Sequence, residues 1–215
     1  MKKLYQCLIS ILAGLVAGAL ISSAVYAVTG FSIFGRIRNK MQSPDEVVFS
    51  ELTATAYATL DCIKERDFAE LARFVHPELG VTFSPNATVT PSTNKRFSAE
   101  EIAAFSHDTS TYIWGVYSAG GEPIELTVAE YFSRFVFCKD YTTAPYLGVN
   151  SIVRSSNALE NITEVFPNVQ YIDFHIPRGE RGSIDDYEWS SLRLGFEEYD
   201  GRLWLMVITH CKWSV

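Results

Sequence analysis

The sequence lacks the motifs by which several classes of enzyme are identified. It contains no G-x-S-x-G, no P-loop and no G-x-G-x-x-G, so serine hydrolases, nucleotide-binding and dinucleotide-binding proteins are without their usual signatures here. No C-x-x-C, H-x-x-x-H or H-E-x-x-H occurs either, and we therefore expect no redox dithiol, no metal site and no cofactor. The sequence predicts no catalytic residues.

Clusters of positive charge are also missing. The chain has 18 Lys and Arg against 25 Asp and Glu, its formal net charge is −7, and its basic residues are scattered. Nucleic-acid binding depends on clustered basic residues that neutralise phosphates, so we expect no nucleic-acid partner. Repeats and low-complexity tracts are absent, and 47% of the 215 residues are hydrophobic, which is enough for the core of one globular domain.

A long apolar run is present at the start of the chain. Lys2 and Lys3 precede the apolar residues 4–34, as in the positive and hydrophobic regions of a signal peptide. Val25 and Ala27 fit the pattern that signal peptidase accepts, so cleavage after Ala27 is one alternative. The other is an uncleaved membrane anchor, because residues 4–21 approach the roughly 20 residues that cross a bilayer.

This run divides the chain into three predicted parts. Residues 1–35 are a signal peptide or membrane anchor, 36–45 are a linker, and 46–215 form the domain. The length of the run favours retention slightly, with the domain anchored outside the cell membrane. Cleavage near Ala27 would instead make the domain periplasmic or secreted.

Helical patterns predominate in the first half of the domain. Apolar residues recur every three or four positions over 48–63, and Pro44 suits the first turn of that helix. A second helix is expected from about Asp67 to just before the next proline. Ser98 and Thr127 each precede a Glu by three residues, and these capping boxes predict two more helix starts.

Strand patterns dominate the rest. Strands are expected over 112–117, 148–153 and 169–176, followed by two long strands joined at Asp200-Gly201. The last strand is apolar on both faces, with Leu203, Leu205 and Val207 on one and Trp204, Met206 and Ile208 on the other. Both faces of the sheet should therefore be covered, one of them by helices. We expect an α+β domain whose bent antiparallel sheet wraps helices and leaves a cavity at its open end.

Candidate ligand-binding residues lie on the predicted strands. Asp173 and His175 are two residues apart and share one face, which permits an acid beside an imidazole, although a solvated polar face is the simpler interpretation. Arg193 lies on the face opposite the apolar residues of its own strand. It could present its guanidinium to an anionic ligand in the cavity, or be a solvated or salt-bridged sheet residue.

Aromatic residues and cysteines complete the candidates. Aromatic side chains on strands could line the same cavity, although they are more commonly core residues. The ligand-binding set is therefore Trp114, Tyr117, Asp173, His175, Arg193 and His210. For Cys62, Cys138 and Cys211, either one disulfide forms and leaves one thiol over, or all three are buried thiols, which we favour.

Many short stretches of the chain carry a family resemblance. They extend from about Val48 to the end and comprise His76-Pro77-Glu78, Gly80-Val81, Phe83-Ser84-Pro85, Trp114-Gly115, Tyr117, Gly121-Glu122-Pro123-Ile124, Leu126-Thr127, Glu130-Tyr131, Phe135-Val136, Asn150, Asn161-Ile162, Glu164, Pro167, Trp189, Ser191-Leu192-Arg193-Leu194, Phe196, Asp200-Gly201, Trp204 and Trp213. In these stretches the chain resembles uncharacterised bacterial exported proteins and lipoproteins with a nuclear transport factor 2-like domain. That resemblance implies a cone-shaped α+β fold and no assigned activity. The chain departs from the pattern in having Cys211, where an acidic residue is expected, and in lacking a lipobox.

Export, a cavity-prone fold and missing catalytic motifs together favour one function. We expect a noncatalytic module that binds a small molecule or an envelope protein, with the N-terminal segment as its membrane contact. Two alternatives stay open at this point. One is a small cone-fold enzyme, isomerase-like or dehydratase-like, that uses a cavity His or acid. The other is a dimeric structural partner in the envelope.

Overall fold

The computed structural model describes residues 44–117, 120–178 and 189–212. The predicted signal peptide or anchor, 1–35, and nearly all of the linker lie outside the described residues. Residues 49–215 form one compact unit, and the fold below is that of this unit. Within the described ranges, no helix is both long enough and apolar enough to cross a membrane.

The described helices include the four that the sequence predicts, which begin at the expected residues, and two short elements, at 141–143 and 162–165, that it does not predict. They are α3 (Pro44–Glu65), α4 (Phe68–Leu71) with the 3-10 turn η1 (Ala72–Phe74), α5 (Ala99–Ala103), α6 (Val128–Tyr131) with the π-helical turn η2 (Phe132–Val136), the 3-10 turn η3 (Tyr141–Thr143) and α7 (Ile162–Val165). Asp67 caps α4. Both capping boxes form with their two reciprocal hydrogen bonds, at Ser98 for α5 and at Thr127 for α6.

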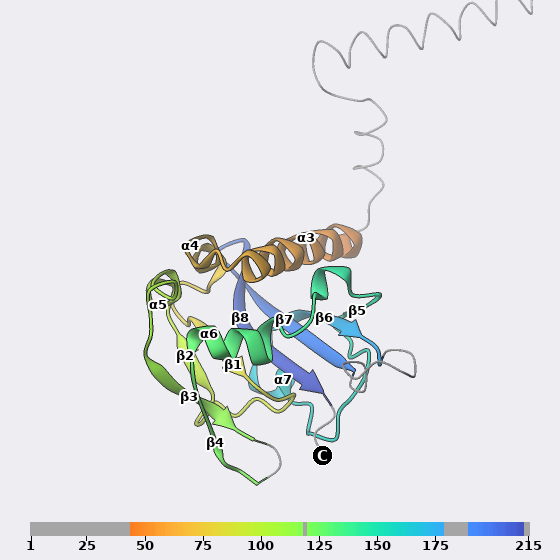
Figure 1. Ribbon diagram of the computed structural model, residues 1–215. Coiled ribbons are helices and arrows are strands. Elements are labelled where there is room, and N and C mark those ends of the chain that lie inside the picture. Colours follow the sequence, from red (N-terminus) through yellow and green to blue (C-terminus); the bar gives the residue numbers. More distant parts are fainter. Residues whose placement is uncertain (1–43, 118–119, 179–188, 213–215) are drawn as a thin grey trace, which may run out of the picture. The chain divides into compact units, whose positions relative to one another are not determined.

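The main sheet has six strands in the order β2-β1-β8-β7-β6-β5 (Figure 1). The strands are β1 (Val81–Ser84), β2 (Lys95–Phe97), β5 (Tyr146–Val149), β6 (Gln170–Ile176), β7 (Ser190–Tyr199) and β8 (Arg202–Lys212). From β5 to β8 the sheet is the predicted antiparallel meander. However, β1 runs parallel to β8, so the sheet is mixed rather than wholly antiparallel.

Two further differences from the predicted strands are local. β5 covers 146–149 rather than 148–153. β3 (Thr111–Val116) and β4 (Pro123–Thr127) pair with each other in a separate two-stranded sheet. The prediction of an α+β domain with a curved sheet is nevertheless confirmed.

A bulge in the β7–β8 hairpin changes which side chains share a face. The register shifts between Gly195 and Phe196, which pair with Val207 and Leu205, so β8 carries one extra residue. Leu205 therefore packs in the helix-facing core before the bulge, while Ile208 does so after it. The prediction that Leu203, Leu205 and Val207 share one face is thus wrong, because the bulge reverses the alternation and places Val207 on the opposite face.

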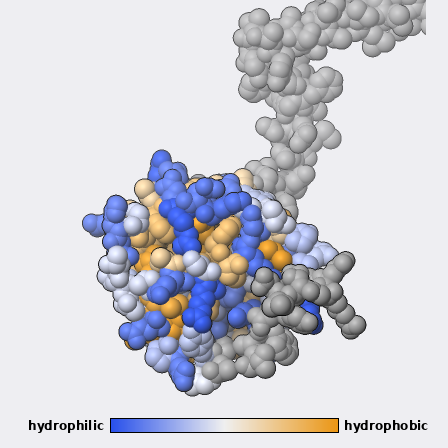
Figure 2. All heavy atoms as spheres, in the orientation of Figure 1, coloured by the Kyte–Doolittle hydropathy of each residue, from blue (hydrophilic) through white to orange (hydrophobic). Residues whose placement is uncertain are grey.

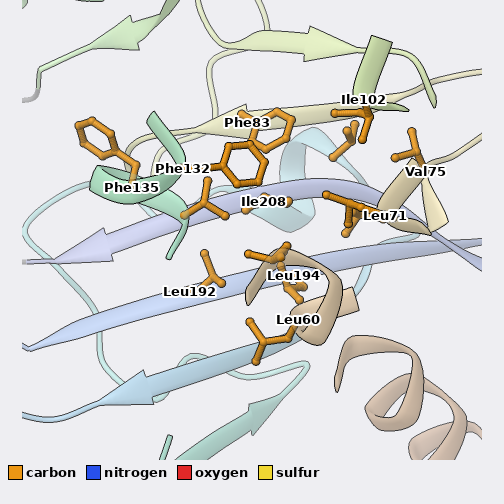
Figure 3. Packing of buried hydrophobic residues seen from close by; sticks show 14 of the residues in the cluster. Leu60, Leu71, Val75, Phe83, Ile102, Phe132, Phe135, Leu192, Leu194 and Ile208 are labelled. Atoms are coloured by element: carbon orange, nitrogen blue, oxygen red, sulfur yellow. The ribbon is translucent and has the colours of Figure 1, made fainter. Parts of the chain in front are cut away.

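Side chains cover both faces of the sheet, as predicted. On the helix-facing side, Leu192 and Leu194 of β7 and Ile208 of β8 point towards Leu60 of α3 and Phe132 of η2 (Figure 3). On the opposite side, α7 and the residues around it form a second buried cluster with β6 and β8: Val89, Ile162, Phe166, Val169, Tyr171, Met206 and Val207.

Candidate functional site

The six predicted site residues lie in three places. Trp114 and Tyr117 belong to the aromatic core and its border. Asp173, His175 and Arg193 are buried on the sheet face opposite α3 and η2, where α7 lies, and His210 is buried on the side of α3 and η2, near the end of β8. The fold therefore brings three of the six together and separates them from the other three.

Trp114 is a core residue. Its ring stacks on Tyr131 with 3.8 Å between the ring centroids, and its Nε1 donates a hydrogen bond to the Leu126 carbonyl at 2.8 Å. Phe83 contacts Trp114 edge-on at 5.5 Å, and Phe97 also packs against the indole. Packed rings thus fill the space around Trp114 between the helices and the sheet.

Tyr117 lies at the border of this aromatic core. Its ring packs against Phe135 at 6.5 Å, and the guanidinium of Arg134 lies 5.9 Å from its centroid. The side chain is only partly buried. Tyr117 is therefore the most accessible of the six.

On the sheet face opposite α3 and η2, Arg193 is enclosed by two carboxylates. Its guanidinium donates hydrogen bonds to Glu160 through Nη1 and Nη2, and its Nε lies 3.5 Å from Asp173 Oδ1. Asp173 Oδ2 accepts a hydrogen bond from the Val153 amide at 2.9 Å. Burial raises the pKa of the Asp173 carboxyl, and the nearby Arg193 partly offsets that effect. The cluster fastens the segment around 153–160 onto the sheet.

His175 belongs to the same face but has a different partner. Its Nδ1 lies 2.8 Å from Ser191 Oγ, and its ring packs against Trp189 at 5.5 Å. Burial lowers the pKa of His175, and Arg154 lowers it further, which favours the neutral imidazole. Asp173 and His175 are thus buried rather than solvated, and each is held by a residue of β7 directly opposite it.

A second polar cluster lies on the helix-facing side and joins four side chains. Ser190 Oγ is 2.9 Å from His210 Nε2 and 2.6 Å from the Tyr141 hydroxyl. Cys138 Sγ is 3.2 Å from that hydroxyl and 3.5 Å from His210 Nε2. The four residues come from the segment between η2 and η3, the start of η3, β7 and β8, so no motif in the sequence could have revealed Tyr141 and Ser190 as members.

Burial favours the neutral forms of two members of the cluster, His210 and Tyr141. The pKa of His210 is lowered to about 3, mainly by burial and secondly by the charge of Lys212, while the Pro85 carbonyl partly opposes the shift. Within the described residues His210 Nδ1 makes no hydrogen bond. Burial also raises the pKa of Tyr141 well above its ordinary value. When the neutral imidazole carries its proton on Nδ1, Nε2 accepts a hydrogen bond from the Ser190 hydroxyl.

The cysteines correct the favoured prediction of three buried thiols. All three described cysteines are free, but Cys62 is partly buried, Cys138 is exposed and only Cys211 is fully buried. Burial raises the pKa of Cys211 to about 12. Burial also raises the pKa of Cys62, and the nearby carboxylates of Glu70, Asp67 and Asp61 raise it further. Among the described residues, no three His, Cys, Asp or Glu side chains are grouped to hold a metal ion.

The His76-Pro77-Glu78 stretch forms a structural corner. His76 Nδ1 accepts hydrogen bonds from the amides of Glu78 and Leu79 at 3.2 and 3.1 Å. Glu78 accepts one from the Tyr199 hydroxyl at 2.5 Å, and the His76 and Tyr199 rings pack at 4.9 Å. The stretch therefore ties the end of β7 to the turn after η1.

Comparison with known proteins gives only remote likenesses. No protein-family model and no curated protein matches the sequence. Among solved structures, Aln2 from a Streptomyces species is 10% identical with a TM-score of 0.35, over 79% of this chain and 91% of that chain. A variant of a protein named Rd1NTF2_05 is 9% identical with a TM-score of 0.31, over 78% of this chain and 99% of that chain.

Proposed function

We propose that this domain is a noncatalytic interaction module that binds a protein at its surface. The proposal rests on one observation: several of the predicted site residues are already bound to partners inside the fold. Trp114 is stacked in the core, Arg193 is bound by Glu160 and Asp173, and His175 is bound by Ser191. Groups committed to internal partners are poorly placed to hold a ligand, which favours binding on the outside of the molecule.

Edge strand β5 is the surface best suited to such binding. It is the last strand of the main sheet, and in the described part of the chain no strand pairs with its outer side (Figure 1). Tyr146 and Leu147 on β5 are 54% and 41% exposed. A free strand edge with exposed apolar side chains can take up an extended segment of a partner through main-chain hydrogen bonds.

Apolar residues elsewhere on the surface give little further evidence on whether β5 is the binding surface. On the face shown in Figure 2, hydrophobic residues form patches separated by hydrophilic side chains. Ile113 on β3 is 57% exposed, but it belongs to the separate two-stranded sheet. Ile113 therefore offers a comparison site, since it is apolar and exposed but lies on a strand of the other sheet and not on β5.

Site-specific photo-cross-linking in the native host tests this proposal. A photoreactive phenylalanine analogue replaces Tyr146 in the full-length chain, and the same analogue replaces Ile113 in the control. We expect a discrete cross-linked protein at 146 and none at 113. A product of twice the mass of the chain would identify a second copy as the partner. Equal cross-linking at the two positions, or none at 146, would contradict the proposal.

We also propose that the N-terminal segment brings this module to the outside of the cell membrane. The support is sequence alone: Lys2, Lys3 and the apolar run that follows them. Protease added to intact cells should digest the domain, and N-terminal sequencing should separate cleavage after Ala27 from retention. A domain that is digested only after the cells are lysed would contradict an external location.

A further inference from the structure

Residues 151–160 lie against the sheet face opposite α3 and η2 and contain no helix or strand. No main-chain hydrogen bond joins them to another residue that the structure describes. Val153 and Leu159 are 37% and 64% exposed, whereas Ile152 and Ala158 pack against buried apolar residues. Apolar burial therefore contributes little to holding this segment, which we call the strap, against the sheet.

An asparagine fixes the chain at each end of the strap. Asn150 has a left-handed φ of 48°, its amide donates to the Tyr171 carbonyl at 2.9 Å, and its Oδ1 accepts from the Tyr171 amide at 2.8 Å. Asn161 is bound to Val89 in a similar way, because its Oδ1 accepts from the Val89 amide at 2.8 Å and its Nδ2 donates to the carbonyl at 3.0 Å. Both ends of the strap therefore have anchors that do not involve the residues between them.

Between these ends, buried charges attach the strap to the sheet. Glu160 accepts two hydrogen bonds from Arg193, whose side chain is completely buried, and the Val153 amide donates to Asp173 Oδ2. Asp173 Oδ1 and Arg193 Nε lie 3.5 Å apart, and neither atom has a hydrogen-bond partner among the described residues. Glu160 is therefore the better-bonded partner of the cation.

This charged attachment is costly to bury. When both carboxyls are ionised, two negative charges face one guanidinium, and burial raises the pKa of Asp173 although Arg193 opposes that shift. Removing Glu160 from the sheet would return its charge to water, which lowers the cost of breaking the pair. One further hydrogen bond, from Thr88 Oγ1 to the Leu159 carbonyl, lies at the surface.

We propose that the strap is a conformational device that opens as a unit between its two asparagine ends, with the Glu160–Arg193 pair as its latch, while the sheet stays folded. The open strap exposes Arg193 together with Thr209, which the register places directly opposite it on β8. Segments with few buried apolar contacts have the low local stability that such opening needs. This goes beyond the proposed interaction function and does not depend on it.

Native-state proteolysis of the full-length chain measures this opening. Trypsin can cut after Arg154, within the strap, and after Arg193, within β7, and mass spectrometry follows the two peptide bonds separately. When opening is fast relative to cleavage, the rate of cleavage follows the population of the open form. We expect the bond after Arg154 to be cut about a hundredfold or more faster than the bond after Arg193.

Urea separates local opening from global unfolding. Cleavage after Arg154 should be unchanged by low concentrations of urea, because opening the strap exposes little surface. Cleavage after Arg193 should rise steeply, because it requires the whole sheet to unfold. The same urea dependence at both bonds would show that the strap is released only when the domain unfolds, which would overturn the proposal.

Substitution of Glu160 tests the latch. Glu160→Gln keeps the size of the side chain and removes its charge, so it should speed cleavage after Arg154 about tenfold in the absence of urea. Glu164→Gln is the matched control, since Glu164 is an exposed residue of α7, and it should change this rate by less than about twofold. Faster cleavage after Arg193 alone would show that the pair survives opening, and the latch would be wrong. If Glu160→Gln does not fold, the urea dependence of the wild type still decides whether the strap opens.

Discussion

Arg193 is a fully buried cation between two carboxylates from different parts of the chain. The sequence placed Arg193 and Asp173 on the polar sides of neighbouring strands, and the register sets them directly opposite each other. Glu160 could not be predicted as the main partner, because it lies 33 residues away in an irregular segment. Removing one member of a buried ion cluster leaves the others desolvated and unpaired.

Replacement of that cation should therefore destabilise the fold strongly. We expect Arg193→Met to lower the free energy of unfolding by about 3–5 kcal/mol, measured by urea denaturation at pH 7. The control is Arg73→Met, which removes an exposed pair with Glu70 and should change stability by less than about 0.5 kcal/mol. Similar losses in the two variants would show that the buried cluster contributes little.

At the scale of elements, the β7–β8 hairpin is the part that the sequence predicted most directly. Asp200 and Gly201 form its turn with φ of 52° and 71°, so both adopt the left-handed conformation of a two-residue hairpin turn. Asp tolerates this conformation and Gly adopts it without strain. The turn signal therefore also fixes where the two longest strands meet.

A side chain at the second turn position should strain the hairpin. We expect Gly201→Ala to lower the free energy of unfolding by about 1–2 kcal/mol, because Ala is disfavoured at positive φ. No atom lies within 4 Å of the position that the new Cβ would take, so backbone conformation and not a clash should cause the loss. Asp200→Asn is the control, since Asn also tolerates positive φ, and thermal or urea denaturation compares the variants. An unchanged Gly201→Ala would mean that the turn relaxes freely.

At the scale of the whole molecule, His210 couples stability to pH. It is buried where β7, β8 and η3 meet, and its pKa falls from 6.5 to about 3 on folding. Above pH 6.5 the imidazole is neutral in both states, so its full contribution is present. Between 6.5 and 3 the unfolded chain binds a proton that the folded chain does not, and stability falls as the pH falls.

The expected size of this effect is about 1.4 kcal/mol per pH unit within that window. Urea denaturation at pH 7, 6 and 5 should show a steeper loss for the wild type than for His210→Gln, which removes the titrating group. Equal slopes for the wild type and His210→Gln would show that the pKa of His210 does not change on folding.

The sequence by itself determined the local starts and turns of this protein. Two helix caps, at Ser98 and Thr127, and the turn at Asp200-Gly201 involve only residues that are close in the sequence. Their formation therefore depends on the local sequence and not on distant segments. Tertiary structure decided the parallel pairing of β1 with β8, the bulge and the polar clusters. Cys138 and His210 are 72 residues apart, and only the packing of distant segments against the sheet brings such side chains into contact.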